Sequence, residues 1–575
     1  MKLGSSDISA VKIGSTDVSK VYIGSTEVWS SFTGLLDTYT GAAAAYSLRQ
    51  LKSGVTNAIE VRIDTTGQPT YDIGFVNGEL DVTTLEGYCT GGLDAYVTTW
   101  YDQSGNGNDA TQTSASAQPQ IVSSGSVITE NGKPAVQFDG SNDLLRSINT
   151  FAVGTSNRTY FHVLKANTST DILYSYGDFS ATGAYWSHAS HSVVGVNGGN
   201  KFWANSPQTS QSLSVLQSLG TNVTDVDFYL NSNLQTSTSS ASAVINTATT
   251  DLFIGNNTTT SYLNGVIQEL VFYNSDQSSN RTGIETNINA NYNMYWDGSQ
   301  TSLLDTYSGS AAAYSLRALS SSYTGPLVEV RRASDNATQD IYAKYDGSLN
   351  VDALESFCSG TNGFVTKWYD QSGNGRDATQ TTASDQPQIV SSGSVITENG
   401  KPAVQFDGSN TILETTTLIN PTIANPFVVS KKNNDNKYAL VFNQWEAGST
   451  RRWYLGYIGS IFGSEPSDNG LEYVLRDSLG TSYSVKTNTE YLNQVLLSGV
   501  TDGSTMYLFA NNNSIGNTTH NGITTSNQYL FLGGGKGNSD LYLNGKLQEA
   551  ILYSSDQSSN RTGIETNIND FYSIY

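Results

Sequence analysis

The chain has 575 residues, and its 51 Asp and Glu against 29 Lys and Arg give a formal net charge of −22. This acidic balance argues against nucleic acid as a partner, because phosphate binding needs clusters of Lys and Arg. The frequent Gly, Ser, Thr and Asn are typical of short strands joined by tight turns. No stretch of about 18 apolar residues occurs and the first residues lack an apolar signal core, so we expect neither a membrane span nor a cleavable leader.

A ten-residue repeat fills the first thirty positions. Leu3–Ile8, Ile13–Val18 and Ile23–Val28 each place apolar residues on both sides of a Gly-Ser step, which predicts short hairpins. Chains below ~40 residues rarely bury a core of their own, so we expect this segment to become ordered against another chain. A disordered leader is the alternative. The residues predicted to make the attachment are Ile13, Val18, Ile23 and Val28.

A much longer repeat organises the rest of the chain. The block Gln118–Asn142 returns unchanged as Gln386–Asn410, and Ser275–Asn289 returns unchanged as Ser555–Asn569. A period of roughly 270 residues has the size of a whole domain. We therefore predict an attachment segment followed by two domains, at residues 1–31, 32–297 and 298–575.

Within each repeat, many short apolar runs alternate with Gly and Asn turns, which predicts a β-sandwich. The closing segment Ser278–Tyr292 is different, because Ile284, Ile288 and Tyr292 recur at helical spacing. The predicted fold is all-β, with two tandem jelly-roll sandwiches that each end in a short C-terminal helix. The second helix carries Ile564, Ile568 and Tyr572.

The two cysteines occupy equivalent places in the two repeats. Cys89 and Cys358 each follow a short helix-like run that begins at a capping residue, Asp81 or Asn350. Equivalent positions in separate domains rarely meet, so we expect two buried free thiols rather than a disulfide.

The phrase Ala135–Asn142, followed by a late Leu-Asn-Gly strand with Gln268 and Glu269, resembles the laminin G-like, concanavalin A-like sandwich. That resemblance implies a carbohydrate or protein ligand. Aromatic rings that reach the surface would stack on sugars, whereas the others would belong to the core. The candidates for ligand binding are Trp186, Trp203, Trp445 and Trp453.

The front half of each repeat also resembles the catalytic domain of the arabinofuranosidase B family of glycoside hydrolases. The phrases that carry this resemblance in the second repeat are Asp305–Tyr307, Gly325–Asp335 and Tyr369–Gly375. The resemblance implies common descent and therefore the fold, whereas activity depends on the site residues.

A retaining glycosidase needs two carboxylates about 5–5.5 Å apart. The resemblance places them in an Asp-Leu-Glu-Asn phrase and in a Gly-Gly-Asp turn. Neither repeat has the first, and the turns read Gly255-Asn256-Asn257 and Gly533-Gly534-Gly535-Lys536. The cysteine expected beside Cys358 is also replaced, by Gly363. We therefore predict no catalytic residue and no hydrolysis of aryl α-L-arabinofuranosides, with Glu446 as the alternative nucleophile.

Two oxygen-rich stretches are candidate calcium sites. Asp139, Asn142 and Asp143 offer ligands, but the second repeat has Thr411 in place of Asp143. The loop Tyr101–Asp109 fits a hydrogen-bonded turn better than a site for Ca²⁺ or sugar. We expect no metal and no cofactor, and Ca²⁺ is left open.

The IGST-type phrases of the first thirty residues resemble terminal segments of bacteriophage virion proteins. This resemblance predicts a non-enzymatic display protein on the surface of a virion, as a fibre, decoration or tail-associated subunit. Its partners would be other virion proteins, further copies in a homo-oligomer (a trimer by analogy) and host-surface carbohydrate. The alternatives are an arabinofuranosidase-like polysaccharide-cleaving enzyme and a bacterial surface adhesin.

Overall fold

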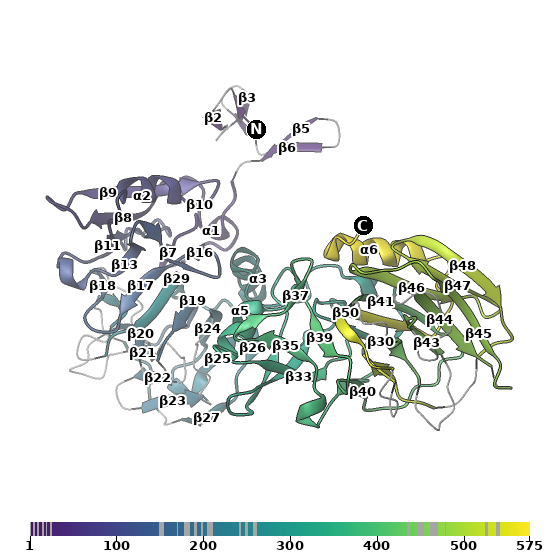
Figure 1. Ribbon diagram of the computed structural model, residues 1–575. Coiled ribbons are helices and arrows are strands. Elements are labelled where there is room, and N and C mark those ends of the chain that lie inside the picture. Colours follow the sequence, from purple (N-terminus) through teal and green to yellow (C-terminus); the bar gives the residue numbers. More distant parts are fainter. Residues whose placement is uncertain are drawn as a thin grey trace. The chain divides into compact units, whose positions relative to one another are not determined.

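The computed structural model divides into two compact units, Met1–Met294 and Tyr295–Tyr575 (Figure 1). From residue 32 onwards it describes every residue except 149–153, 169–170, 178–184, 189–192, 197–198, 204–210, 241–242, 248–250, 257–260, 434–437, 446–452, 460–469, 478, 524–526 and 536–540. Before residue 32 it describes the backbone of six short strands.

Those six strands form the predicted hairpins. They are β1 (Lys2–Leu3), β2 (Ser6–Asp7), β3 (Val11–Ile13), β4 (Thr16–Val18), β5 (Lys20–Ile23) and β6 (Thr26–Ser30). They pair antiparallel as β1–β2, β3–β4 and β5–β6. Ile13, Val18, Ile23 and Val28 lie in the last four of these strands, but their side chains lie outside the described part of the chain. The attachment role stays a prediction.

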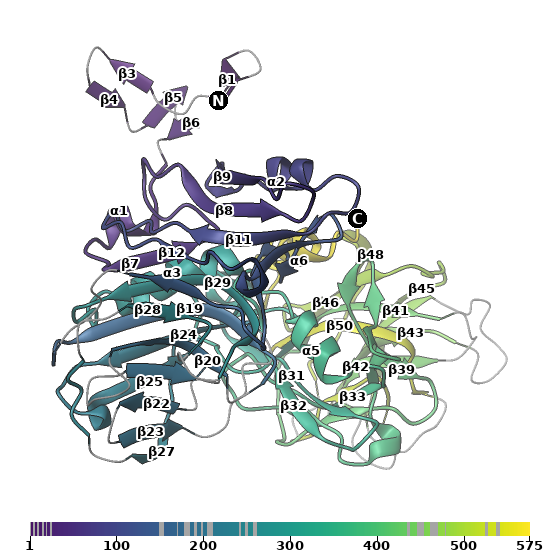
Figure 2. The ribbon, with the colours of Figure 1, turned by 90° about the vertical axis from the view of Figure 1, so that its left-hand side faces the viewer.

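The sheet of unit 1 is organised around the long strand β29 (Asn264–Tyr273). This strand pairs antiparallel with β7 (Ala44–Ser47), β17 (Val136–Asp139) and β19 (Arg158–Ala166). Its side chains are almost all buried, as expected for a strand covered on both faces. The sheet closes on itself through further antiparallel strands, which include β8 (Asn57–Ile63), β9 (Thr70–Val76), β11 (Ala95–Trp100), β13 (Gln120–Ser123), β18 (Leu145–Ser147), β20 (Ile172–Tyr176), β21 (Tyr185–His188), β22 (Val193–Val196), β23 (Gly199–Trp203), β24 (Ser212–Ser218), β25 (Val226–Leu230), β27 (Ser237–Ser240) and β28 (Leu252–Ile254). Figure 2 shows β22, β23 and β27 side by side.

Unit 2 repeats this arrangement. Its central strand β50 (Asn544–Tyr553) pairs with β30 (Ser310–Ser315), β39 (Val404–Asp407) and β41 (Asn425–Lys432). The other strands of this sheet include β31 (Val328–Arg332), β32 (Thr338–Ile341), β33 (Gly363–Trp368), β35 (Gln388–Ser391), β40 (Leu413–Thr415), β42 (Ala439–Asn443), β43 (Trp453–Tyr457), β44 (Leu471–Arg476), β45 (Ser482–Thr487), β46 (Val495–Thr501), β47 (Thr505–Ala510), β48 (Asn513–Thr519) and β49 (Phe531–Leu532). The predicted all-β class, with one large sandwich-like sheet system per unit, is confirmed.

A short helix closes each unit, as predicted. These helices are α3 (Arg281–Tyr292) and α6 (Arg561–Tyr572). In α6 the residues Ile564, Ile568 and Tyr572 are buried and pack on a face formed by β41, β46 and β50 (Figure 1). The spacing of these apolar residues along the helix explains why it lies flat on the sheet.

A buried ion pair ties this helix to the sheet. In unit 2 the guanidinium of Arg317 donates two hydrogen bonds to Glu549, at 2.8 and 3.1 Å, and a third to Asn567 of α6 at 2.9 Å. Both ends of the ion pair are almost fully buried. Unit 1 repeats it with Arg49, Glu269 and Asn287.

Two helices of seven residues, one in each unit, confirm the predicted caps and thiols. In α2 (Val82–Tyr88) the carboxylate of Asp81 accepts a hydrogen bond from the Thr84 amide at 3.0 Å. Asn350 caps α5 (Val351–Phe357) in the same way. Cys89 and Cys358 follow these helices as buried free thiols. Among the helices of the described part, none is long and apolar enough to cross a membrane.

Candidate active site on the outer face of unit 2

Four neighbouring strands of unit 2, β42 to β45, pair antiparallel in chain order. Because side chains alternate along a strand, one set enters the main core and the other lies on the outer face. The outer set forms a second apolar cluster, separate from the core. It contains Leu440, Tyr454, Val474 and Leu541, with Tyr438 and Trp445 packed against it. We call this group the outer-face cluster.

Glu472 on β44 is the carboxyl group of the outer-face cluster. Its side chain lies opposite Gly456 on β43 and Lys486 on β45, and the residue is 8% exposed. The hydroxyl of Tyr454 donates to its Oε2 at 2.7 Å, and the hydroxyl of Tyr438 donates to the same oxygen. Two phenols therefore fix the orientation of one carboxyl group.

Burial raises the pKa of Glu472 above its ordinary value, although Lys486 and Ser484 act in the opposite direction. A carboxyl group whose pKa is raised by burial holds its proton more strongly, and such a group can act as a general acid. Beside it Trp445 and Tyr454 lie edge to face, with 5.4 Å between the ring centroids.

The glycine turn that ends β49 borders the same cluster. A Cβ atom added at Gly535 would lie 3.0 Å from Leu440 Cδ1 and 3.2 Å from Trp445 Cδ1. This turn, Gly533–Gly535, is where the family resemblance places an acid. Glu472 and this turn therefore border the same cluster, Glu472 through its hydrogen bonds to Tyr438 and Tyr454. Lys536 lies outside the described residues.

The four tryptophans named from the sequence have different surroundings. Trp453 is fully buried, and its indole N–H donates to Gln444 Oε1 at 2.9 Å. Trp203 is buried against Phe228 in unit 1. Only Trp445 joins the outer-face cluster among those whose side chains are described. The side chain of Trp186, on β21, and the whole of Glu446 lie outside the described part.

The loop Tyr101–Asp109 is a hydrogen-bonded turn, as favoured from the sequence. The Asp102 carboxylate accepts hydrogen bonds from the backbone N–H groups of Ala45, Ser104 and Asn108, at 2.9, 2.9 and 3.0 Å. These bonds join the loop to β7. Within the described residues, no group of three or more His, Cys, Asp or Glu side chains is placed to hold a metal ion.

Sequence reasoning did not find Glu472. The available signal was an acidic residue inside the apolar run Leu471–Leu475, which reads as a strand buried on both faces. The partners of Glu472 are Tyr454 on β43 and Tyr438 just before β42, which lie 18 and 34 residues earlier in the chain. Only the pairing of the strands brings them together.

Comparisons with known proteins point to glycoside hydrolases. Residues 305–412 match the family "Alpha-L-arabinofuranosidase B, catalytic". The chain is 49% identical over 70 residues to an alpha-L-arabinofuranosidase of Hypocrea jecorina, and 51% identical over 71 residues to a probable alpha-L-arabinofuranosidase B of Aspergillus fumigatus. Each match spans 12% of this chain and 14% of the relative, so the chain spans about a seventh of the length of the relatives that it matches.

A crystal structure of an arabinofuranosidase complexed with arabinofuranosyl-alpha-1,2-xylobiose has a TM-score of 0.36 at 18% identity, over 46% of this chain and 64% of that one. The matches correct four predictions. The non-enzymatic display role and the absence of enzyme activity are wrong, because the matching family and relatives are arabinofuranosidases. The virion location and the related virion, fibre and structural-protein assignments are wrong for the same reason, because the relatives are fungal arabinofuranosidases. The sequence resemblance to the arabinofuranosidase B catalytic family is confirmed for residues 305–412.

Proposed function

We propose that this protein is a glycoside hydrolase that removes arabinofuranosyl groups from polysaccharides, with its active site on the outer face of unit 2. The observation that carries the proposal is the match of residues 305–412 to the arabinofuranosidase B catalytic family, in the same unit as the buried carboxyl of Glu472. In this proposal Glu472 protonates the leaving glycosidic oxygen, and Trp445 and Tyr454 bind the sugar.

The test is hydrolysis of 4-nitrophenyl α-L-arabinofuranoside and of arabinan by the purified full-length chain. We expect turnover by the wild type, and Glu472→Gln should lower kcat by about 10²–10⁴-fold because the amide cannot donate the proton. Glu490→Gln is the matched control, because Glu490 is exposed beyond the end of β45. Its rate should equal that of the wild type.

Glycoside hydrolysis needs a second carboxylate besides the acid. Glu446 follows Trp445 directly in the chain, and Trp445 belongs to the outer-face cluster. Glu446→Gln therefore belongs in the same series. If the wild type fails to hydrolyse both substrates, or if Glu472→Gln retains the full rate, the proposal is rejected.

A further inference from the structure

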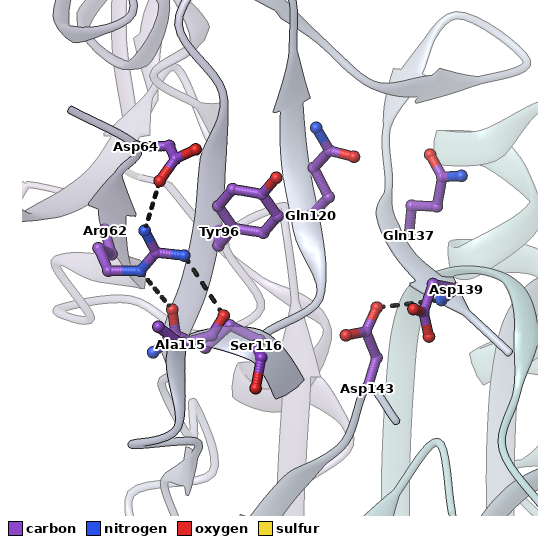
Figure 3. Close-up of a pocket in the computed structure, with 10 residues that line it drawn as sticks. Arg62, Asp64, Tyr96, Ala115, Ser116, Gln120, Gln137, Asp139 and Asp143 are labelled. Atoms are coloured by element: carbon purple, nitrogen blue, oxygen red, sulfur yellow. Dashed lines mark hydrogen bonds and ion pairs between the residues drawn. The ribbon is translucent and has the colours of Figure 1, made fainter. Parts of the chain in front are cut away.

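A polar pocket of about 340 Å³ opens in unit 1, between strands β8, β11, β13 and β17 (Figure 3). Arg62 and Tyr96 line one side, Gln137, Asp139 and Asp143 line the other, and Gln120 lies between them. The volume falls in the range of about 300–1,000 Å³ that is usual for small-molecule sites.

Asp143 is the unusual residue of this pocket. It is 6% exposed, and its carboxylate accepts one hydrogen bond, from the backbone N–H of Asp139 at 3.0 Å. No Lys, Arg or His in the described chain forms an ion pair with it. Burial and the neighbouring charge of Asp139 raise the pKa of Asp143 to about 7. A buried carboxyl group without a cation is costly to maintain.

Unit 2 shows that the turn does not need this carboxyl. The equivalent residue there is Thr411, whose hydroxyl oxygen accepts the hydrogen bond from the Asp407 N–H at 2.8 Å. Asp139 and Asp407 each accept hydrogen bonds from the N–H groups two and three positions further on. In unit 2 Asp407 also accepts hydrogen bonds from the N–H and the hydroxyl of Thr411. The fold therefore accepts threonine, and the carboxyl of Asp143 has to be explained by something other than the turn.

Two further positions around the pocket also differ between the units, and at each the residue of unit 1 carries a side-chain oxygen that the residue of unit 2 lacks. Tyr96 lies under the Arg62 guanidinium as Phe364 lies under Arg331, so a hydroxyl is present only in unit 1. Asp64 of unit 1 corresponds to Ala333 of unit 2. The remaining polar residues are the same in both units: Arg62, Gln118, Gln120, Gln137 and Asp139 correspond to Arg331, Gln386, Gln388, Gln405 and Asp407. Around this pocket unit 1 therefore has two carboxyl groups and a phenol, where unit 2 has a threonine, an alanine and a phenylalanine.

The free polar groups of the pocket identify the ligand class. The side-chain amide of Gln137 is exposed and makes no hydrogen bond in the described structure, and one oxygen of Asp143 is likewise free. Gln137 and Asp143 line the same side of the pocket (Figure 3), and an amide together with a carboxyl group suits hydroxyl groups, which both donate and accept hydrogen bonds. An anion is disfavoured, because Arg62 is already held by Gln118 at 2.7 Å and by Asp64 at 3.1 Å.

We propose that this pocket of unit 1 binds a neutral saccharide through adjacent hydroxyl groups, with Asp143, Gln137 and Tyr96 as the recognising residues. The site would hold a chain of the polysaccharide while the outer-face cluster of unit 2 cleaves it. The choice of arabinose as first probe rests on the proposed function, but the readout is binding and not turnover. Loss of hydrolysis in Glu472→Gln and loss of binding in unit 1 are therefore separate results.

The test is titration of the full-length chain with arabinotriose, xylotriose and trigalacturonate, followed by calorimetry and by hydrogen exchange of residues 137–143. We expect at least one of the two neutral trisaccharides to bind with a Kd below about 10 mM and to protect this segment. Trigalacturonate should not protect it. Asp143→Thr should weaken binding at this site by at least about tenfold, the equivalent of one lost polar contact.

The controls make use of the duplication. Asp143→Thr introduces the residue that unit 2 already uses in this turn, so the variant should fold, and Gln137→Ala alters an exposed side chain and should also weaken binding. Thr411→Ser changes the equivalent turn of unit 2 and should leave protection of residues 137–143 unchanged. The proposal is overturned if neither neutral trisaccharide protects the segment, or if Asp143→Thr retains full affinity.

Discussion

At the scale of single residues, Asp143 links stability to pH. Its pKa rises from an ordinary value near 3.8 to about 7 in the folded chain, because of burial and of Asp139. A raised pKa means that the folded state favours the protonated form. The stabilisation is therefore complete below about pH 4 and is lost as the pH rises through 7.

The variant Asp143→Thr tests this linkage, because it removes the titrating group and keeps the turn. We expect the wild type to lose about 1 kcal/mol relative to the variant between pH 4.5 and pH 7.5, after allowance for solvent screening. This corresponds to about 2–4 °C in the Tm of unit 1, measured by calorimetry at both pH values. Asp64, Asp139 and Arg62 also face the pocket, so Asp139→Asn should be measured beside it. If the difference in Tm between the wild type and Asp143→Thr does not change with pH, the raised pKa does not belong to Asp143.

At the scale of elements, the closing helix depends on a buried ion pair. Arg317→Met leaves the Glu549 carboxylate buried without its guanidinium, and we expect a loss of about 3–5 kcal/mol in the free energy of unfolding. The double variant Arg317→Met, Glu549→Met should recover much of this loss, because no buried charge remains. Urea unfolding followed by tryptophan fluorescence measures both. If Arg317→Met is as stable as the wild type, the ion pair between Arg317 and Glu549 contributes nothing to the free energy of unfolding.

Sequence patterns predicted those elements whose signal is local. The helix with Ile564, Ile568 and Tyr572 and the caps at Asp81 and Asn350 depend on residues a few positions apart, and the structure has them. Glu472 was not predicted, since its two tyrosine partners lie 18 and 34 residues away in the chain and only the pairing of the strands brings them to it. The function was predicted wrongly because the missing motif phrases were taken as the loss of catalysis, whereas residues 305–412 match a family of arabinofuranosidases.

At the scale of the whole molecule, each unit has a hydrophobic core of its own. Since Arg49 and Arg317 secure the closing helices of different units, we expect their variants to destabilise different parts of the chain. Calorimetry of the full chain should resolve two components, with Arg49→Met lowering the Tm of one and Arg317→Met lowering that of the other. A single transition that moves by the same amount in both variants would show that the units unfold together.

The identical block that the two units share has a consequence for refolding. It contributes β17 to unit 1 and β39 to unit 2, and these strands pair with β29 and β50 in the same register relative to the shared Asn-Gly start of each partner. A chain that collapses from denaturant can therefore insert either copy beside either partner with little difference in energy. Exchanged strands between tandem domains are a known failure of multidomain folding. During synthesis on the ribosome, the first unit emerges before the second copy of the block exists, so β29 can pair only with β17. Refolding by dilution from denaturant lacks this order, because both copies are present from the start.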